Sequence, residues 1–237
     1  MKKKAIVLVI VLIILFVFYF WGKTFKSQII SYINNERTIA DVIKEHRQRV
    51  ESILIPAFAK SEIAYPPQKI TLLFFKKEKR LELWAEKENQ WVHIKNYPVL
   101  AASGNSGPKL KEGDRQVPEG LYQIELLNPN SSYHLSMRIN YPNEFDLNHA
   151  KIDNRQDLGG DIYIHGNSVS IGCLAMGDEV SEELFVLANQ VGLQNIHVII
   201  APYDSRPKDL SSNIIDQPTW LSELYTMISN DLKNYLN

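Results

Sequence analysis

The sequence predicts a mainly β (α+β) domain that follows a transmembrane helix and a helical stalk and precedes a C-terminal helix. Between Gln68 and Ala201, short apolar or alternating stretches succeed one another, which is typical of strands. Residues 5–21 form an unbroken apolar run, whereas 23–60 and 220–232 carry apolar side chains at helical spacing. The expected parts are a transmembrane anchor (1–22), a helical stalk (23–67), a β-rich domain (68–202) and a C-terminal helical extension (203–237).

Composition restricts the class of protein. The chain has 237 residues, 45% of them hydrophobic, with a net charge of −1. A folded protein is therefore expected, and the absence of a basic field argues against a nucleic-acid partner. The single cysteine, Cys173, cannot form an internal disulfide, so a reactive thiol is the alternative to consider.

The N-terminal apolar run is predicted to be an uncleaved anchor. Crossing a bilayer takes about 20 apolar residues, with a lower limit of about 17. A cleaved signal peptide is the alternative, but its apolar core is shorter and residues 18–21, Phe-Tyr-Phe-Trp, do not resemble a small-residue cleavage site. Because Lys2, Lys3 and Lys4 precede the run, the N-terminus is expected in the cytoplasm and the rest of the chain outside, on the inner membrane.

The helical region after the anchor has two interpretations of equal weight. It is either a stalk or a helix packed on the β-rich domain. Pro56 and Pro66–Pro67 are expected to end it.

The β-rich part contains several predicted strands and loops. Residues 132–139 alternate, which places Tyr133, Leu135, Met137 and Ile139 on one face and His134, Ser136 and Arg138 on the other. Residues 140–160 are expected to be a long loop. The expected strands include 70–75, 81–86, 91–94, 97–102, 121–127 and 196–200.

The segment from Asp161 to Gly177 combines a histidine and the cysteine. His165 ends a predicted strand, and Cys173 follows a small polar loop and precedes a helix that Asp178 is expected to cap. An imidazole within reach takes a thiol proton, and a helix N-terminus favours the thiolate. The backbone amides of Gly172 and Cys173 are candidate oxyanion donors. A buried cysteine and a core histidine are the alternative, but the glycines and the polar loop favour a cysteine nucleophile.

These residues resemble a known signature. His165-Gly166, a short spacer and Ser170-x-Gly172-Cys173 resemble the catalytic motif of the L,D-transpeptidases with a YkuD-type domain, and residues 127–136 and 140–143 resemble the YafK-type branch. The resemblance covers roughly residues 69–201. It implies a β-rich catalytic domain in which Cys173 attacks a peptide carbonyl of peptidoglycan peptide stems, with His165 as base and without a cofactor.

The resemblance also assigns roles to other residues. It implies that Tyr133, His134 and Arg138 form a substrate wall, and that the turn at 117–122 lines the cleft. Gly166, Ser170 and Gly172 are expected to shape the loop between His165 and Cys173, which is called the nucleophile loop below.

Two positions depart from the family pattern. Ile171 stands where a second histidine is usual and Ala175 where an arginine is common, and the spacer between His165 and Cys173 is short. Ile171 is therefore expected to pack under the loop.

Other functions are weighed against this one. A peptidoglycan hydrolase of the same fold, a binding module without catalysis and a membrane-tethered scaffold are alternatives. A metal site built from Cys173, His165, His134 and His197 lacks convincing ligand spacing, so no metal is predicted.

Overall fold

The computed structural model describes residues 36–206, 210 and 218–236. The predicted anchor lies outside these residues. Within the described part of the chain, no helix combines the length and apolar character needed to cross a membrane. From Ile39 onward, the described residues form one compact unit.

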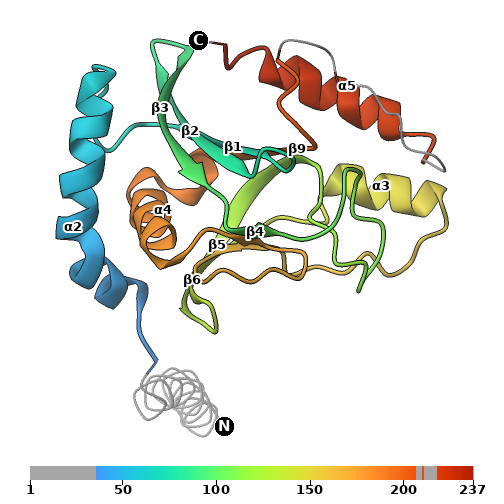
Figure 1. The fold of residues 1–237 in the computed structure, drawn as a ribbon, viewed down its shortest axis with the longest axis horizontal. Coiled ribbons are helices and arrows are strands. Elements are labelled where there is room, and N and C mark those ends of the chain that lie inside the picture. Colours follow the sequence, from blue (N-terminus) through green and yellow to red (C-terminus); the bar gives the residue numbers. More distant parts are fainter. Residues whose placement is uncertain (1–35, 207–209, 211–217, 237) are drawn as a thin grey trace, which may run out of the picture. The chain divides into compact units, whose positions relative to one another are not determined.

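This unit is a mainly β structure, as the sequence predicts, and helices lie on both sides of its sheet (Figure 1). The strands are β1 (Ile70–Phe75), β2 (Arg80–Lys87), β3 (Gln90–Pro98), β4 (Ala101–Ala102), β5 (Gly120–Ser131), β6 (His134–Ile139), β7 (Tyr163–His165), β8 (Leu174–Ala175) and β9 (Ile196–Ala201). The helices are α2 (Ile39–Lys60), α3 (Glu144–Ile152), α4 (Asp178–Val191), the short 3₁₀ helix η1 (Leu193–Asn195) and α5 (Leu221–Leu232).

The described strands form one sheet in the order β3-β2-β1-β9-β5-β6-β7-β8-β4. β1 and β9 are parallel neighbours near its centre, and all six residues of β1 are buried. This explains why residues 70–75 form a nearly continuous apolar run, since a strand covered on both faces needs no polar side. Toward the other edge, β6, β7 and β8 lie side by side and carry the predicted site.

Two hydrophobic layers cover the sheet (Figure 1). On one face α4 packs against the sheet, and α2 packs on the outer side of α4. Val42, Val50, Leu54 and Phe58 of α2 are fully buried in this layer. Residues 39–60 are therefore a helix packed on the β-rich domain and not a separate stalk. On the opposite face, the apolar side of α5 packs on β1, β2 and β9.

Two local expectations were wrong. Pro56 lies inside α2 instead of ending it, because the helix continues to Lys60. The expected loop at 140–160 contains α3, which begins with a capping box between Asn143 and Asp146. Such a box satisfies two N-terminal backbone amides and so supports a short helix in a polar segment.

A buried ion pair fixes the loop that reaches the site. Lys76 at the end of β1 donates to the Glu119 carboxylate at 2.9 Å and to the carbonyl oxygens of Gly107 and Val117, each at 3.0 Å. Tyr225 of α5 donates to the other Glu119 oxygen at 3.0 Å. Because each buried charge is paired and hydrogen-bonded, the segment between residues 103 and 119 has a defined course.

Candidate active site

The strands β7 and β8 bring the predicted nucleophile and base to one pocket. β7 ends at His165, which lies opposite Ala175 of the parallel β8, and Cys173 immediately precedes β8. The imidazole and the thiol both line a pocket of about 310 Å³. Its lining consists of Asn128, Asn130, Ser131, Ser132, Tyr133, Ser136, Asp161, Tyr163, His165 and Cys173.

Hydrogen bonding defines the tautomer of His165. Its Nδ1 lies 2.5 Å from the carbonyl oxygen of Gly166, which can only accept, so Nδ1 carries the proton and Nε2 keeps its lone pair. The residue is 2% exposed, and the Tyr133 ring packs against the imidazole with a centroid distance of 4.8 Å. Burial lowers the pKa of His165, although the bond to Gly166 opposes this. At neutral pH the ring is therefore a neutral base.

The thiol of Cys173 is also neutral at rest. It is partly exposed, and its Sγ lies 3.7 Å from the carbonyl oxygen of Asp161. Burial raises the pKa of Cys173, and a hydrogen bond from the Tyr163 backbone lowers it by less. The expected thiolate was wrong because burial raises the pKa of Cys173. In addition, α4 begins only at Asp178, and the N-terminal charge of a helix falls off within its first turn.

Asp178 does not cap α4. The N-cap is Gly177, without a side-chain hydrogen bond, and Asp178 is the first helical residue. Its carboxylate instead accepts the backbone N–H of Asn167 at 2.7 Å. Asp178 thus holds the start of the nucleophile loop against the helix.

Two serines fasten the other end of the nucleophile loop. Ser170 Oγ donates to the carbonyl oxygen of Cys173 at 2.6 Å and accepts from the backbone N–H of Ser103 at 3.2 Å. The N–H of Gly172 donates to Ser103 Oγ at 2.6 Å. The Gly172 amide therefore already has a partner, and it can serve an oxyanion only if the Ser103 hydroxyl turns away. Gly172 has φ +106°, a conformation that favours glycine.

The predicted substrate wall divides into three different environments. Tyr133 lines the pocket together with Ser136, although alternation placed these two on opposite faces. The alternation breaks because His134 has φ +71°. His134 is absent from the pocket lining, and its Nε2 lies 2.7 Å from Glu182 of α4. Arg138 pairs with Glu125 at 2.7 Å and reaches the pocket only through Asp161, at 3.5 Å.

Two further expectations about the cleft were wrong. Ile171 is 72% exposed and does not pack under the nucleophile loop. The turn at 117–122 does not line the pocket, since Val117 and Glu119 are buried and Glu119 pairs with Lys76.

Sequence reasoning missed most of the polar lining. Asp161 and Tyr163 belong to the motif segment but received no role, and Asn128 and Ser131 come from the far end of β5. Alternation along 161–165 was a signal for Tyr163, which shares one side of β7 with His165, whereas Asp161 precedes the strand. The β5 residues depend on the pairing of distant strands, which local sequence does not reveal.

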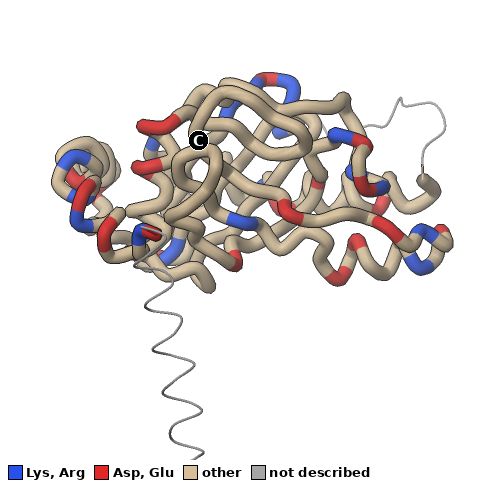
Figure 2. Tube along the Cα trace, turned by 90° about the horizontal axis from the view of Figure 1, so that it is seen from below, with Lys and Arg blue, Asp and Glu red and all other residues tan. Residues whose placement is uncertain are grey.

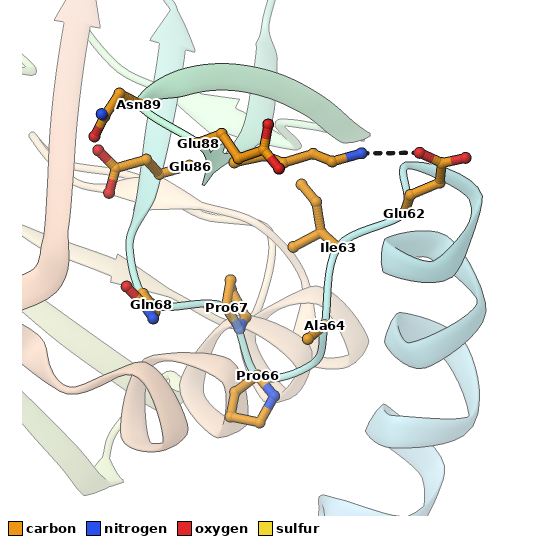
Figure 3. A pocket seen from close by; sticks show the side chains of 10 residues that line it. Glu62, Ile63, Ala64, Pro66, Pro67, Gln68, Glu86, Glu88 and Asn89 are labelled. Atoms are coloured by element: carbon orange, nitrogen blue, oxygen red, sulfur yellow. Dashed lines mark hydrogen bonds and ion pairs between the residues drawn. The ribbon is translucent and has the colours of Figure 1, made fainter.

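A larger cavity, of about 490 Å³, lies elsewhere (Figure 3). It is formed by the segment after α2 and by the β2–β3 turn, and Lys87 pairs with Glu62 at its rim at 2.9 Å. It contains neither the thiol nor the imidazole, so volume alone does not identify the reactive site. Figure 2 shows basic and acidic residues interspersed along the described chain.

Comparisons with known proteins point to one family. The family described as YkuD, L,D-transpeptidase catalytic domain, matches residues 70–199, more than half of the chain. YafK of Escherichia coli (strain K12), provisionally named an L,D-transpeptidase, is 32% identical over 139 residues, covering 56% of this chain and 54% of YafK. The same values hold for YafK of Escherichia coli O157:H7. The chain thus spans about half the length of the curated relatives it matches.

Two solved structures show lower similarity. The helical cell shape determining protein Pgp2 of Campylobacter jejuni has 23% identity and a TM-score of 0.47, over 60% of this chain and 50% of Pgp2. Bd1075 of Bdellovibrio bacteriovorus has 20% identity and a TM-score of 0.42, over 73% of this chain and 57% of Bd1075.

Proposed function

The chain belongs to the YkuD family of L,D-transpeptidase catalytic domains, and we propose that it is a cysteine acyl transferase acting on peptidoglycan peptide stems. The observation that carries this proposal is the pairing of Cys173 and His165 in one pocket, with the imidazole oriented by Gly166. A binding module without catalysis has no need of a nucleophile and an oriented base together.

Acylation starts from the neutral thiol and the neutral imidazole. As Sγ of Cys173 attacks the peptide carbonyl, Nε2 of His165 takes the thiol proton, and the ring becomes an imidazolium held by Gly166. The tetrahedral intermediate collapses when the imidazolium gives this proton to the leaving amine. The C–N bond breaks and a thioester to Cys173 remains.

Deacylation repeats the proton transfer with an acceptor. Nε2 takes a proton from the attacking group, and the thiolate that leaves is reprotonated by the imidazolium. An amine acceptor gives a new peptide bond, and water gives hydrolysis. Asp161 is the single carboxylate among the ten described residues lining the pocket, and its side chain is 77% exposed. This carboxylate accepts a hydrogen bond from the Tyr163 hydroxyl at 3.2 Å and lies 3.5 Å from the Arg138 guanidinium, so its charge is already balanced and does not select an amine over water.

Product analysis tests the proposal. The full-length chain is incubated with muropeptides, and the products are identified by mass spectrometry. We expect cross-linked peptides from the wild type and none from Cys173→Ala, while Ser52→Ala, a change on the exposed side of α2 and outside the pocket lining, serves as the control. Shortened peptides without cross-links indicate hydrolysis instead. Unchanged products from Cys173→Ala contradict the proposal.

We also propose that residues 1–22 anchor the chain, with the catalytic domain on the extracytoplasmic side. The support is the sequence pattern alone, namely the three lysines before an apolar run with an aromatic end. A reporter fused after Asn237 should be active only outside the cytoplasm. A mature N-terminus beyond Trp21 would show that the segment is cleaved.

A further inference from the structure

A second group of ligand-type side chains lies outside the reactive pocket. His46 of α2, His134 of β6 and Glu182 of α4 place their ligand atoms within 4.8 Å of one another. Their side chains are 11%, 27% and 12% exposed, so the group is mostly shielded from water. Two imidazoles and one carboxylate are a ligand set that zinc uses when it keeps one further position for water.

The spacing of these atoms suits a small ion. His134 Nε2 lies 2.7 Å from Glu182 Oε1, and His46 Nδ1 lies 3.2 Å from Glu182 Oε2. In a tetrahedral zinc site with bonds of 2.0–2.1 Å, ligand atoms are about 3.3 Å apart. The two contacts with Glu182 are therefore close to the spacing of a coordination shell.

The hydrogen bonding of His46 is incomplete without an ion. A neutral His46 that donates from Nδ1 to Glu182 has a bare Nε2, and this atom is buried without a hydrogen-bond partner. If Nδ1 binds a metal, the ring proton moves to Nε2. Glu45 Oε1 lies 3.7 Å from Nε2 and could then accept it after a small movement. A carboxylate on the outer nitrogen is the usual partner of a metal-bound histidine.

The backbone of His134 gives an independent indication. This residue has φ +71°, which is uncommon for a side chain other than glycine. The result is that the His134 ring contacts Glu182 while its neighbour Tyr133 packs on His165. This backbone conformation thus accompanies an imidazole whose Nε2 contacts Glu182 and whose ring lies edge-on to that of His46.

We propose that His46, His134 and Glu182 bind one divalent transition-metal ion of the zinc type. The ion joins α2 and α4 to β6, which follows Tyr133. It therefore holds α2 and the β5–β6 hairpin together, beside the pocket that contains Cys173 and His165. The site was invisible in the sequence, because its ligands are separated by long stretches of chain and form no spacing motif.

Arg49 affects how tightly the ion binds. Its guanidinium donates to Glu182 Oε2, so it remains as an outer partner that orients the ligating carboxylate. Its positive charge also repels a cation, which weakens binding. Arg49→Gln keeps a donor and removes the charge, and this variant should bind zinc more tightly than the parent chain.

Calorimetric titration with zinc chloride tests the proposal. The full-length Cys173→Ala chain is used, since the thiol and His165 would otherwise compete for the metal. We expect one zinc per chain, an affinity lowered at least about tenfold in His134→Ala and in Glu182→Gln, and an unchanged affinity in His197→Ala. His197 is an exposed histidine on β9 and is the matched control.

Several results would overturn the proposal. They are the absence of stoichiometric binding at micromolar zinc, equal affinity in Glu182→Gln and the parent, or weaker binding in Arg49→Gln. If His134→Ala does not fold by circular dichroism, His46→Gln replaces it with the same expected loss. A cobalt spectrum of the chain that retains Cys173 should show the Glu182-dependent site without a thiolate band. A cobalt spectrum that does not change in Glu182→Gln counts against the proposal.

Discussion

Replacing Gly166 by alanine should disturb the reactive pocket more than the size of a methyl group suggests. A Cβ on Gly166 would lie 2.6 Å from Asp178 Oδ1, 2.8 Å from the carbonyl oxygen of Tyr133 and 3.0 Å from His134 Cβ. The carboxylate can rotate, but the Tyr133 oxygen belongs to the backbone, so the hairpin must shift. Overpacking of this kind costs about 1–3 kcal/mol, and we expect the upper half of that range.

The loss of activity should exceed the loss of stability. Moving Tyr133 changes the ring packed on His165, and Gly166 itself accepts the hydrogen bond that fixes the imidazole. Urea unfolding gives the free energy of unfolding, and single-turnover acylation gives the rate. The matched control is Gly160→Ala, because a Cβ there meets nothing within 4 Å. Wild-type stability and acylation in Gly166→Ala would refute the reasoning.

Three further predictions concern side chains in or near the domain core. Because burial raises the pKa of Cys173, its alkylation by iodoacetamide at pH 7 should be slower than that of a free cysteine. The alkylation rate should keep increasing at a pH above that at which an ordinary thiol is fully ionised. Faster alkylation than that of a free cysteine at pH 7 contradicts this prediction. Tyr133→Ala should slow acylation, whereas Tyr133→Phe should acylate at the wild-type rate, because the ring of Tyr133 packs against His165. Equal acylation rates in Tyr133→Ala and the wild type would exclude a positioning role for the ring. Burial raises the pKa of Asp146 to about 6, above its value in the unfolded chain, so the folded state holds the proton more tightly. The free energy of unfolding should therefore fall by up to about 3 kcal/mol between about pH 4 and pH 6, and Asp146→Asn should remove this slope; a slope unchanged in that variant points to other groups.

Local sequence patterns were sufficient for most of the strands and for the two proposed partners of the reaction, whereas the strands expected at 91–94 and 97–102 are β3 (Gln90–Pro98) and the short β4 (Ala101–Ala102). The apolar run at 70–75 and the helical stripe at 220–232 correspond to β1 and α5. His165 and Cys173 share a pocket because both flank one short loop, so their proximity depended little on the rest of the fold. The family assignment is confirmed by the family match.

The wrong predictions concern side chains whose orientation, burial or protonation depends on tertiary contacts. One residue with positive φ, His134, reversed the expected faces of Tyr133 and Ser136. The protonation of the thiol depended on its burial and on where α4 begins, and neither follows from the motif. Ile171 is apolar and yet exposed, because the loop around it is held by the hydroxyls of Ser170 and Ser103 and not by packing.

The pH dependence of Cys173 acylation tests most directly whether a neutral imidazole acts as the base. In single-turnover experiments with a muropeptide, thioester formation is followed by mass spectrometry in the wild type and in His165→Ala. Because the pKa of His165 is lowered, the wild-type rate should increase as the pH rises through the acidic range and be level by pH 7. The variant should be slower by about 10²–10⁴-fold at pH 7, and its rate should still increase at alkaline pH as the thiol ionises. Equal rates at pH 7 in the two chains would contradict the account.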